Sequence, residues 1–357
     1  MDKITVLLPL CGAAAGITLG YVARRNFFCT LSALEQHWYA GNSDGLRTWV
    51  LAAVFAAIFT QSAVALGLAT TASSFYLTPS FGLPAAIIGG LTFGFGMALI
   101  GTCGYGALVR LGGGSLKSLM AVLILGITAL STQRGVLALS RTEFLDRFQL
   151  DLSFAGNQSL PAIASALTGL NLTLIVTLLL IALPAAWVFS DAGFRSNRRA
   201  MATAAIIGGV VTFGWIATSG LSGNSFVPVQ IESASFVAPV ADTILQFIAF
   251  TGSSPDYGVG VVLGTVAGAA FAAHRADDVR WEACDDAAEL SRHIAGAVLM
   301  GFGGVLALGC TIGQGVSAAS LLALSVPVCM FSIGLGARMG LAWLLEGSAL
   351  APFRKFD

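Results

Sequence analysis

Two cysteines, Cys103 and Cys310, stand in glycine-rich stretches whose residue types could bind an anion. The stretches read GTCGYG at 101–106 and GCTIGQG at 309–315, and each comes at the end of a long apolar run. Each glycine lowers helix propensity by roughly 1 kcal/mol, so both runs are expected to lose their helical structure at the cysteine. A helix broken in lipid exposes N–H and C=O groups that protein, water or a ligand must satisfy. The pattern therefore predicts backbone dipoles and a thiol that face a central path.

The thiols and the glycine backbone at these two breaks suit different atoms of an anion. A thiol is a weak donor that suits a soft anionic sulfur, whereas free backbone N–H groups suit anionic oxygens. Because few charged residues fall inside the apolar runs, an anion would meet neutral dipoles there and could leave again. The glycines that we predict to line such a path are Gly101, Gly104, Gly106, Gly309 and Gly313.

Of the other four cysteines, one is a candidate for the same path, and three are interpreted without a functional role. Cys29, in ARRNFFCTLSAL, follows the first apolar run and is expected to approach the same path. Cys11 and Cys329 lie inside apolar runs and are interpreted as small buried hydrophobes, and Cys284 as an exposed thiol. No two of the six cysteines have CxxC spacing, which argues against a thiol oxidoreductase or a soft-metal pump. We predict no metal site and no cofactor.

The composition indicates the solvent in which these residues work. Of the 357 residues, 56% are hydrophobic and only 10% are charged, whereas ordinary soluble domains have roughly 25% charged residues. Such a chain cannot cover a surface that faces water, so we predict an all-α polytopic membrane protein. The formal net charge is zero, which argues against a nucleic-acid partner.

Nine apolar runs are long enough to span a bilayer. The first is interpreted as an uncleaved helix, since Leu10 stands where a signal-peptide cleavage site needs a small residue. Two further stretches, 26–46 and 219–257, are more polar and are broken by glycine or proline. They are expected to be either re-entrant segments or interfacial helices. The predicted spans are about 4–23, 48–70, 82–108, 115–133, 161–189, 200–218, 258–274, 293–313 and 318–345.

The distribution of basic residues predicts the orientation of the chain in the membrane. The side reached after the first span carries thirteen of them, the other side carries four, and Arg338 falls inside a span. We therefore expect a multi-pass membrane protein with its N-terminus outside and its C-terminus in the cytoplasm. The thirteen are Arg24, Arg25, Arg47, Arg110, Lys117, Arg195, Arg198, Arg199, Arg275, Arg280, Arg292, Arg354 and Lys355.

The stretch around Cys103 has an internal copy 207 residues later. IIGGLTFGFGMALIGTCGYG at 87–106 aligns with IAGAVLMGFGGVLALGCTIG at 294–313, with a coincident cysteine, a coincident phenylalanine and four coincident glycine pairs, of which Gly106 and Gly313 are the last. The copies lie in the third and eighth predicted spans, so they cross the membrane in opposite directions. Such inverted repeats build many secondary transporters, with a site at the repeat interface, and they also build channels. We expect one transport domain over 1–357, with repeat halves of about 1–133 and 161–345.

Arg110 lies seven residues after Cys103, at the inner end of the third predicted span. A cation there could draw an anion out of the path. The alternative is an ordinary basic residue that anchors the span at the cytoplasmic surface.

These motifs carry a resemblance to a known family. GFGMALIGTCGYGALVRLGGG and GFGGVLALGCTIGQG resemble the paired signatures of the YeeE/YedE family of bacterial thiosulfate permeases, and the similarity extends from the FFC segment to the last span. The resemblance implies an hourglass-shaped, nine-span inverted-repeat bundle with extra short helices and three pore cysteines, which correspond to Cys29, Cys103 and Cys310. It also implies inward uptake of thiosulfate for inorganic sulfur assimilation. Some relatives act with selenium compounds or with a TusA-like sulfur carrier, which we expect here to be a separate cytoplasmic protein.

Two other functions stay open. One is a membrane sulfurtransferase or redox module that passes persulfide sulfur through a cysteine; the other is a channel or carrier for another sulfur or selenium anion. A redox enzyme would need a resolving cysteine pair or a cofactor site, and the sequence has neither signature, so we do not expect an enzyme. It contains no GxxxxGK[ST] motif for ATP. If transport is coupled to protons, Glu232 or Asp242 is the expected relay.

The predicted orientation can be tested with reporter fusions. A reporter attached after Asp357 should be cytoplasmic, and one inserted in the 135–158 loop should be external, because of the thirteen-to-four basic asymmetry. Paired alkaline phosphatase and fluorescent protein fusions at each site measure this. The opposite result at both sites would contradict the orientation and reverse the transport geometry.

Overall fold

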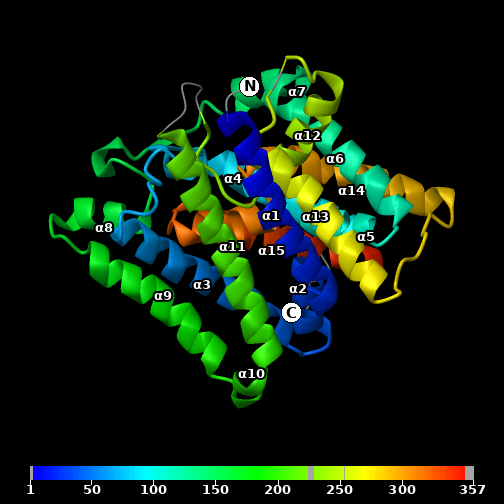
Figure 1. Cartoon of the computed structure of the whole chain (residues 1–357), viewed down its shortest axis with the longest axis horizontal. Helices are drawn as coiled ribbons and strands as arrows, with labels where there is room; N and C mark the ends of the chain where they lie inside the picture. Colours follow the sequence, from blue (N-terminus) through cyan, green and yellow to red (C-terminus); the bar gives the residue numbers. More distant parts are fainter. Residues whose placement is uncertain (1–2, 224–228, 253, 350–357) are drawn as a thin grey trace.

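The computed structural model describes residues 3–223, 229–252 and 254–349, which are almost entirely helical (Figure 1). The C-terminal Arg354, Lys355 and Asp357 lie outside the described residues. The first group of helices comprises α1 (Lys3–Asn26), α2 (Thr30–Tyr39), α3 (Asp44–Ala65), η1 (Phe75–Leu77), α4 (Leu83–Ile100), α5 (Gly104–Gly112) and α6 (Leu116–Arg134). A connecting group follows, with α7 (Val136–Phe144), η2 (Ser153–Ala155), α8 (Leu160–Thr168), α9 (Thr173–Phe189) and α10 (Ala192–Ser196). The last group comprises α11 (Arg198–Ser222), α12 (Ala238–Ile248), α13 (Tyr257–Arg275), α14 (Ala287–Leu306), the π-helix η3 (Gly313–Ala318) and α15 (Ser325–Glu346).

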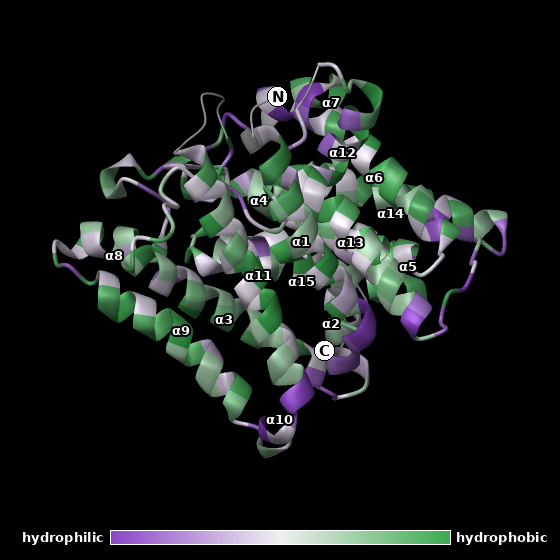
Figure 2. Ribbon diagram, in the orientation of Figure 1, coloured by the Kyte–Doolittle hydropathy of each residue, from purple (hydrophilic) through white to green (hydrophobic). Residues whose placement is uncertain are grey.

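Within the described residues, seven helical stretches are long and apolar enough to cross a membrane, which confirms an all-α polytopic membrane protein. They include α1 continued by α2 and α4 continued by α5, together with α3, α6, α11, α13 and α15. The remaining two predicted spans correspond in position to α14, with 20 residues, and α9, with 17. Figure 2 shows hydrophobic residues along the outer helices such as α9, while hydrophilic residues gather near α2 and α10.

Two of the predicted spans have different boundaries in the structure. The span predicted over 161–189 is two helices, because the chain turns at Gly169, whose φ is +68°. The span predicted over 318–345 begins only at Ser325, since the residues before it form η3 and a turn. Both boundaries were predicted wrongly for the same reason. Hydropathy stays high across these turns, so it does not mark where a helix begins or ends. The stretches 26–46 and 219–257 contain the short helices α2 and α12, and residues 224–228 of the second lie outside the described residues.

The centre of the bundle is an antiparallel crossing of α4 and α14, the two helices of the internal copy. A Cβ added to Gly89 would lie 2.7 Å from the carbonyl oxygen of Gly303, and one added to Gly96 would lie 2.5 Å from that of Gly296. The repeat offset of 207 relates Gly89 to Gly296 and Gly96 to Gly303, so the residue pair of the first contact corresponds to the residue pair of the second. This exchange is what a two-fold axis between inverted copies requires, and glycine permits the two backbones to touch.

The other helices pack in pairs that correspond between the first and last groups. Helix α4 packs on α15 as α14 packs on α6, and α1 packs on α13 as α11 packs on α3. The short helices follow the same rule, because α2 packs on α3 and α12 packs on α13. The helices α7 to α10 connect the two groups, and two short strands, β1 (Ser80–Phe81) and β2 (Leu150–Asp151), join the connection to the loop before α4.

The glycine crossing can be tested with matched alanine substitutions. Gly96→Ala should lower the free energy of unfolding by about 1–3 kcal/mol, because its methyl group would overlap the backbone of α14. Gly209→Ala is the control: it also lies inside a helix, but its Cβ would enter open space, so it should be neutral or stabilise by about 0.5–1 kcal/mol. The thermal denaturation midpoint of the detergent-purified protein measures both. Equal midpoints for the two variants would contradict the close crossing.

Candidate functional site

The first predicted helix break lies between α4 and α5. Helix α4 ends at Ile100, and Gly101 takes a left-handed conformation with φ +77°. Cys103 then stands at the N-cap of α5, where its Sγ accepts a hydrogen bond from the N–H of Gly106 at 3.4 Å. The thiol is fully buried. It therefore occupies the position at which a helix N-terminus offers N–H groups to an anion.

The second break repeats this arrangement after α14. Helix α14 ends at Leu306, and the chain then passes through Leu308 and Gly309, with φ +56° and +154°. The Sγ of Cys310, which is also fully buried, accepts from the N–H of Gly313 at 3.4 Å. The two cysteines thus make the same contact with the glycine three residues later. The difference is the helix that follows, which is the π-helix η3 in place of an α-helix.

The described residues bring the three candidate cysteines together. Cys29 stands at the N-cap of α2, and its Sγ lies 3.9 Å from Oγ1 of Thr102, the neighbour of Cys103. Thr30, the residue after Cys29, in turn donates to Thr311, the residue after Cys310, at 3.1 Å. These thiols come from the ends of three different helices, so the fold assembles them from distant parts of the chain.

Threonine hydroxyls lie between the thiols. Thr311 follows Cys310 directly, and its Oγ1 accepts from Oγ1 of Thr30 at 3.1 Å. Thr30, Thr102 and Thr311 are all buried. The centre of the bundle is therefore lined by neutral donors and acceptors, namely thiols, hydroxyls and backbone groups at helix ends.

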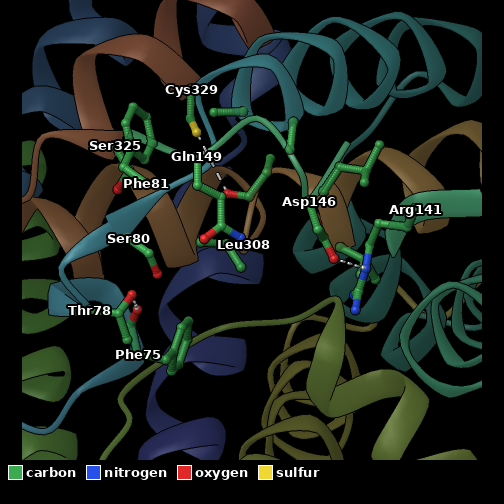
Figure 3. Close-up of a pocket in the computed structure, with 16 residues that line it drawn as sticks. Phe75, Thr78, Ser80, Phe81, Arg141, Asp146, Gln149, Leu308, Ser325 and Cys329 are labelled. Carbon is green, nitrogen blue, oxygen red and sulfur yellow. Dashed lines mark hydrogen bonds and ion pairs between the residues drawn. The ribbon is translucent and has the colours of Figure 1, made fainter. Parts of the chain in front are cut away.

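Two cavities approach the second break from the end of the bundle where α7 lies. One, of about 310 Å³, is shown in Figure 3, where Arg141 and Asp146 lie across from Ser325 and Cys329. The Nε of Arg141 pairs with Oδ2 of Asp146 at 3.1 Å. Arg141 and Leu308 also line the second cavity. A cation thus stands over the approach to the break.

The second cavity, of about 240 Å³, reaches the break itself, since Gly309 and Ser235 form part of its wall. It also contains Glu232 and an ion pair of 3.4 Å between Arg134 and Asp242. Glu232 is 8% exposed, and its Oε1 accepts from the N–H of Gly258 at 3.2 Å. Charged groups therefore line the same cavity that reaches the second break.

The opposite end of the site lies between α2 and α3. A small cavity of about 70 Å³ contacts Cys29 and Trp49 there. Arg110 is exposed, and its Nη2 donates to the carbonyl oxygen of Gly101 at 3.0 Å. Arg110 thus lies at the first helix break itself, not merely at the end of a span. Of the remaining predicted glycines, Gly104 begins α5 and Gly106 lies two residues further, where a Cβ would overlap Oγ1 of Thr102.

Several residues at the site were not predicted. Thr102 and Thr311 flank the two cysteines on opposite sides, in GTCG and GCTIG, and this pairing was a readable signal. Tyr76, in the short helix η1, reaches the second break from a loop with no motif. Cys329, interpreted as packing, is buried and donates to the carbonyl oxygen of Ala307 at 3.6 Å, and it also lines the cavity of Figure 3.

Comparison with known proteins decides the family. The family described as sulphur transport matches residues 25–339, which include all three cysteines of the site. The chain belongs to this family. Its relatives include a protein of Escherichia coli K12 named thiosulfate transporter TsuA, 25% identical over 86% of each chain. Another protein named thiosulfate transporter TsuA, from Spirochaeta thermophila, is 29% identical over 72% of this chain and 77% of its own.

The position of Arg110 leads to a test that separates charge from hydrogen bonding. If its positive charge attracts the anion, Arg110→Gln should lower sulfur-anion uptake by up to roughly tenfold, and Arg110→Lys should retain most of it. The uptake of the wild type should also fall with rising ionic strength more steeply than that of the glutamine variant. Equal losses in both variants would indicate instead that the bond to Gly101 matters. Unchanged uptake in both variants would indicate that Arg110 only anchors the span at the membrane surface.

Proposed function

We propose that this protein is a permease that takes up thiosulfate through the path between the two helix breaks. The observation that carries the proposal is the assembly of Cys29, Cys103 and Cys310 around two inverted helix ends. The sulphur transport family and the names of the relatives support the substrate. The protein acts as a transporter and not as an enzyme.

A neutral centre suits the transfer of a doubly charged anion. Among the described acidic, basic and histidine side chains, only Glu232 and His293 are less than one tenth exposed. An arginine at the narrowest point would hold a dianion too tightly for conduction, whereas thiols and dipoles bind weakly enough for release. Arg141 at one end and Arg110 at the other can attract the anion without trapping it.

The two thiols use their sulfur atoms in the same way. Each sulfur accepts an N–H bond from the glycine at the start of the next helix. The S–H proton of each cysteine then remains available to a second partner. The terminal sulfur of thiosulfate is a soft acceptor for that proton, and free N–H groups nearby suit its oxygens. The anion passes from Cys310 to Cys103 and Cys29 by exchange of these weak bonds.

The proposal includes the setting of the protein. It lies in the bacterial inner membrane as one transport domain, with the N-terminus in the periplasm and the C-terminus in the cytoplasm. The repeat halves correspond to the helix groups α1–α6 and α11–α15, which pack in equivalent pairs. Thiosulfate delivered inside supplies inorganic sulfur assimilation, with a separate TusA-like carrier as acceptor.

The second candidate is a sulfurtransferase that carries persulfide sulfur on a cysteine. The closeness of Cys29 and Cys103 is the observation that favours it, because both thiols lie around Thr102. A persulfide found on Cys103 or Cys310 during turnover would support this alternative and contradict a pure permease. Mass spectrometry of the protein trapped with a thiol-blocking reagent during uptake distinguishes the two.

Substitution of single thiols tests the permease. Cys103→Ser and Cys310→Ser should each abolish thiosulfate-dependent growth of a sulfur-auxotrophic host, because serine is harder and better hydrated than a thiol. Cys29→Ser should be milder, since Cys29 is only half-buried. Cys11→Ser, in the apolar part of α1, is the matched control and should be near neutral. Uptake of labelled thiosulfate at equal membrane expression is the measurement, and full activity in Cys103→Ala and Cys310→Ala would exclude the thiol relay.

A further inference from the structure

Tyr76 is a buried tyrosine whose hydroxyl lacks a well-formed hydrogen bond. It is 1% exposed, and its Oη makes no hydrogen bond of full geometry, although Oγ of Ser235 lies beside it. The ring is held firmly, because it packs 4.0 Å from Phe75 and edge-on to Trp215 at 6.4 Å between centroids. The backbone N–H of Tyr76 also donates to Oγ of Ser74 at 3.4 Å. Buried polar groups are nearly always paired, so an unpaired one that the fold holds in place needs an explanation.

The hydroxyl of Tyr76 lies at the second helix break. A Cβ added to Gly313 would lie 2.9 Å from Tyr76 Oη and 2.8 Å from Oγ of Ser235. A Cβ added to Gly309 would lie 3.2 Å from the same Oη. Gly313 is the residue whose N–H contacts Cys310 Sγ. The hydroxyl, the thiol and the helix N-terminus therefore lie together behind the wall that Ser235 and Gly309 form in the 240 Å³ cavity.

The first helix break has an equivalent hydroxyl. The offset of 207 relates Gly313 to Gly106, and the hydroxyl against Gly106 belongs to Thr102. Each break therefore combines a cysteine, a glycine N–H and a hydroxyl, although the hydroxyl comes from the adjacent residue in one half and from the distant η1 helix in the other. The same set of groups at two inverted positions favours a role in the path over a packing accident.

We propose that the Tyr76 hydroxyl binds an oxygen of the anion as the anion arrives at Cys310. This inference rests on the proposed uptake of thiosulfate and assigns the two ends of that anion. The hydroxyl is a hard donor that suits an anionic oxygen, and the thiol of Cys310 suits the terminal sulfur. The pair recognises an anion with an oxygen-rich end and a soft sulfur end. Tyr76 is thus a substrate-binding residue of the half of the path near α7.

The experiment removes only the hydroxyl oxygen. Tyr76→Phe should raise the KM for labelled thiosulfate uptake roughly tenfold, the effect of losing one hydrogen bond to a charged group, with little change in the maximal rate. The matched control is Tyr257→Phe, since Tyr257 is also fully buried and its hydroxyl also lacks a partner. Its hydroxyl faces Gly214 in α11 and not a helix break, so the control should keep the KM of the wild type.

A binding measurement separates substrate recognition from stability. Without an anion, purified Tyr76→Phe should denature at nearly the same temperature as the wild type or above it, because the lost hydroxyl makes no hydrogen bond of full geometry, only a contact with Ser235. Thiosulfate should then stabilise the variant less than it stabilises the wild type and Tyr257→Phe. Wild-type KM and wild-type stabilisation in Tyr76→Phe would overturn the inference, and so would a variant that fails to fold. Failure of the wild type itself to take up thiosulfate would instead refute the proposed function.

Discussion

Backbone groups inside a bilayer have no water to bind, and this constraint shapes the whole molecule. A helix interrupted in hydrocarbon is stable only where protein surrounds the freed N–H and C=O groups. The chain interrupts two helices, after Ile100 and after Leu306, and buries the cysteine that follows each interruption. The short helices α2 and α12, the π-helix η3 and the loop with Tyr76 all gather around these points. They enclose the polar backbone that the breaks expose.

The crossing of α4 and α14 fixes how the breaks face each other. Because glycines let the two backbones touch, one break lies on each side of the crossing point, and neither can shift along the other. The neutral thiols and hydroxyls thereby occupy a short central zone, and charged side chains line the cavities that lead to it. A weak and symmetric centre with cations outside is a sensible arrangement for an anion that must enter and leave.

The sequence was sufficient for the features that repeat or that depend on local propensity. The glycine clusters predicted both helix breaks, and the 207-residue offset predicted the antiparallel pair that the glycine contacts display. It failed where hydropathy averages over a short turn, as at Gly169, which divides α8 from α9. Tyr76 could not be predicted, because no local pattern indicates that a loop residue will lie against Gly313, more than 200 positions later. The roles of the predicted site residues still rest on the transport experiments.

Helix α9 packs mainly on α3, α8 and α10, and among its described side chains only Val188 is fully enclosed. It adds little to the core, but it bears on how two copies of one helix group came to point in opposite directions. Four helices of each group cross the bundle. In the first group these are α1, α3, α4 and α6, and in the last group they are α11, α13, α14 and α15. A tandem duplication of an even number of crossings would leave both copies pointing the same way. One additional crossing, which α9 would supply, changes the parity, so that the second copy would enter the membrane upside down. A helix of 17 residues at the periphery would then be the reason that the two cysteine breaks oppose each other instead of lying in parallel.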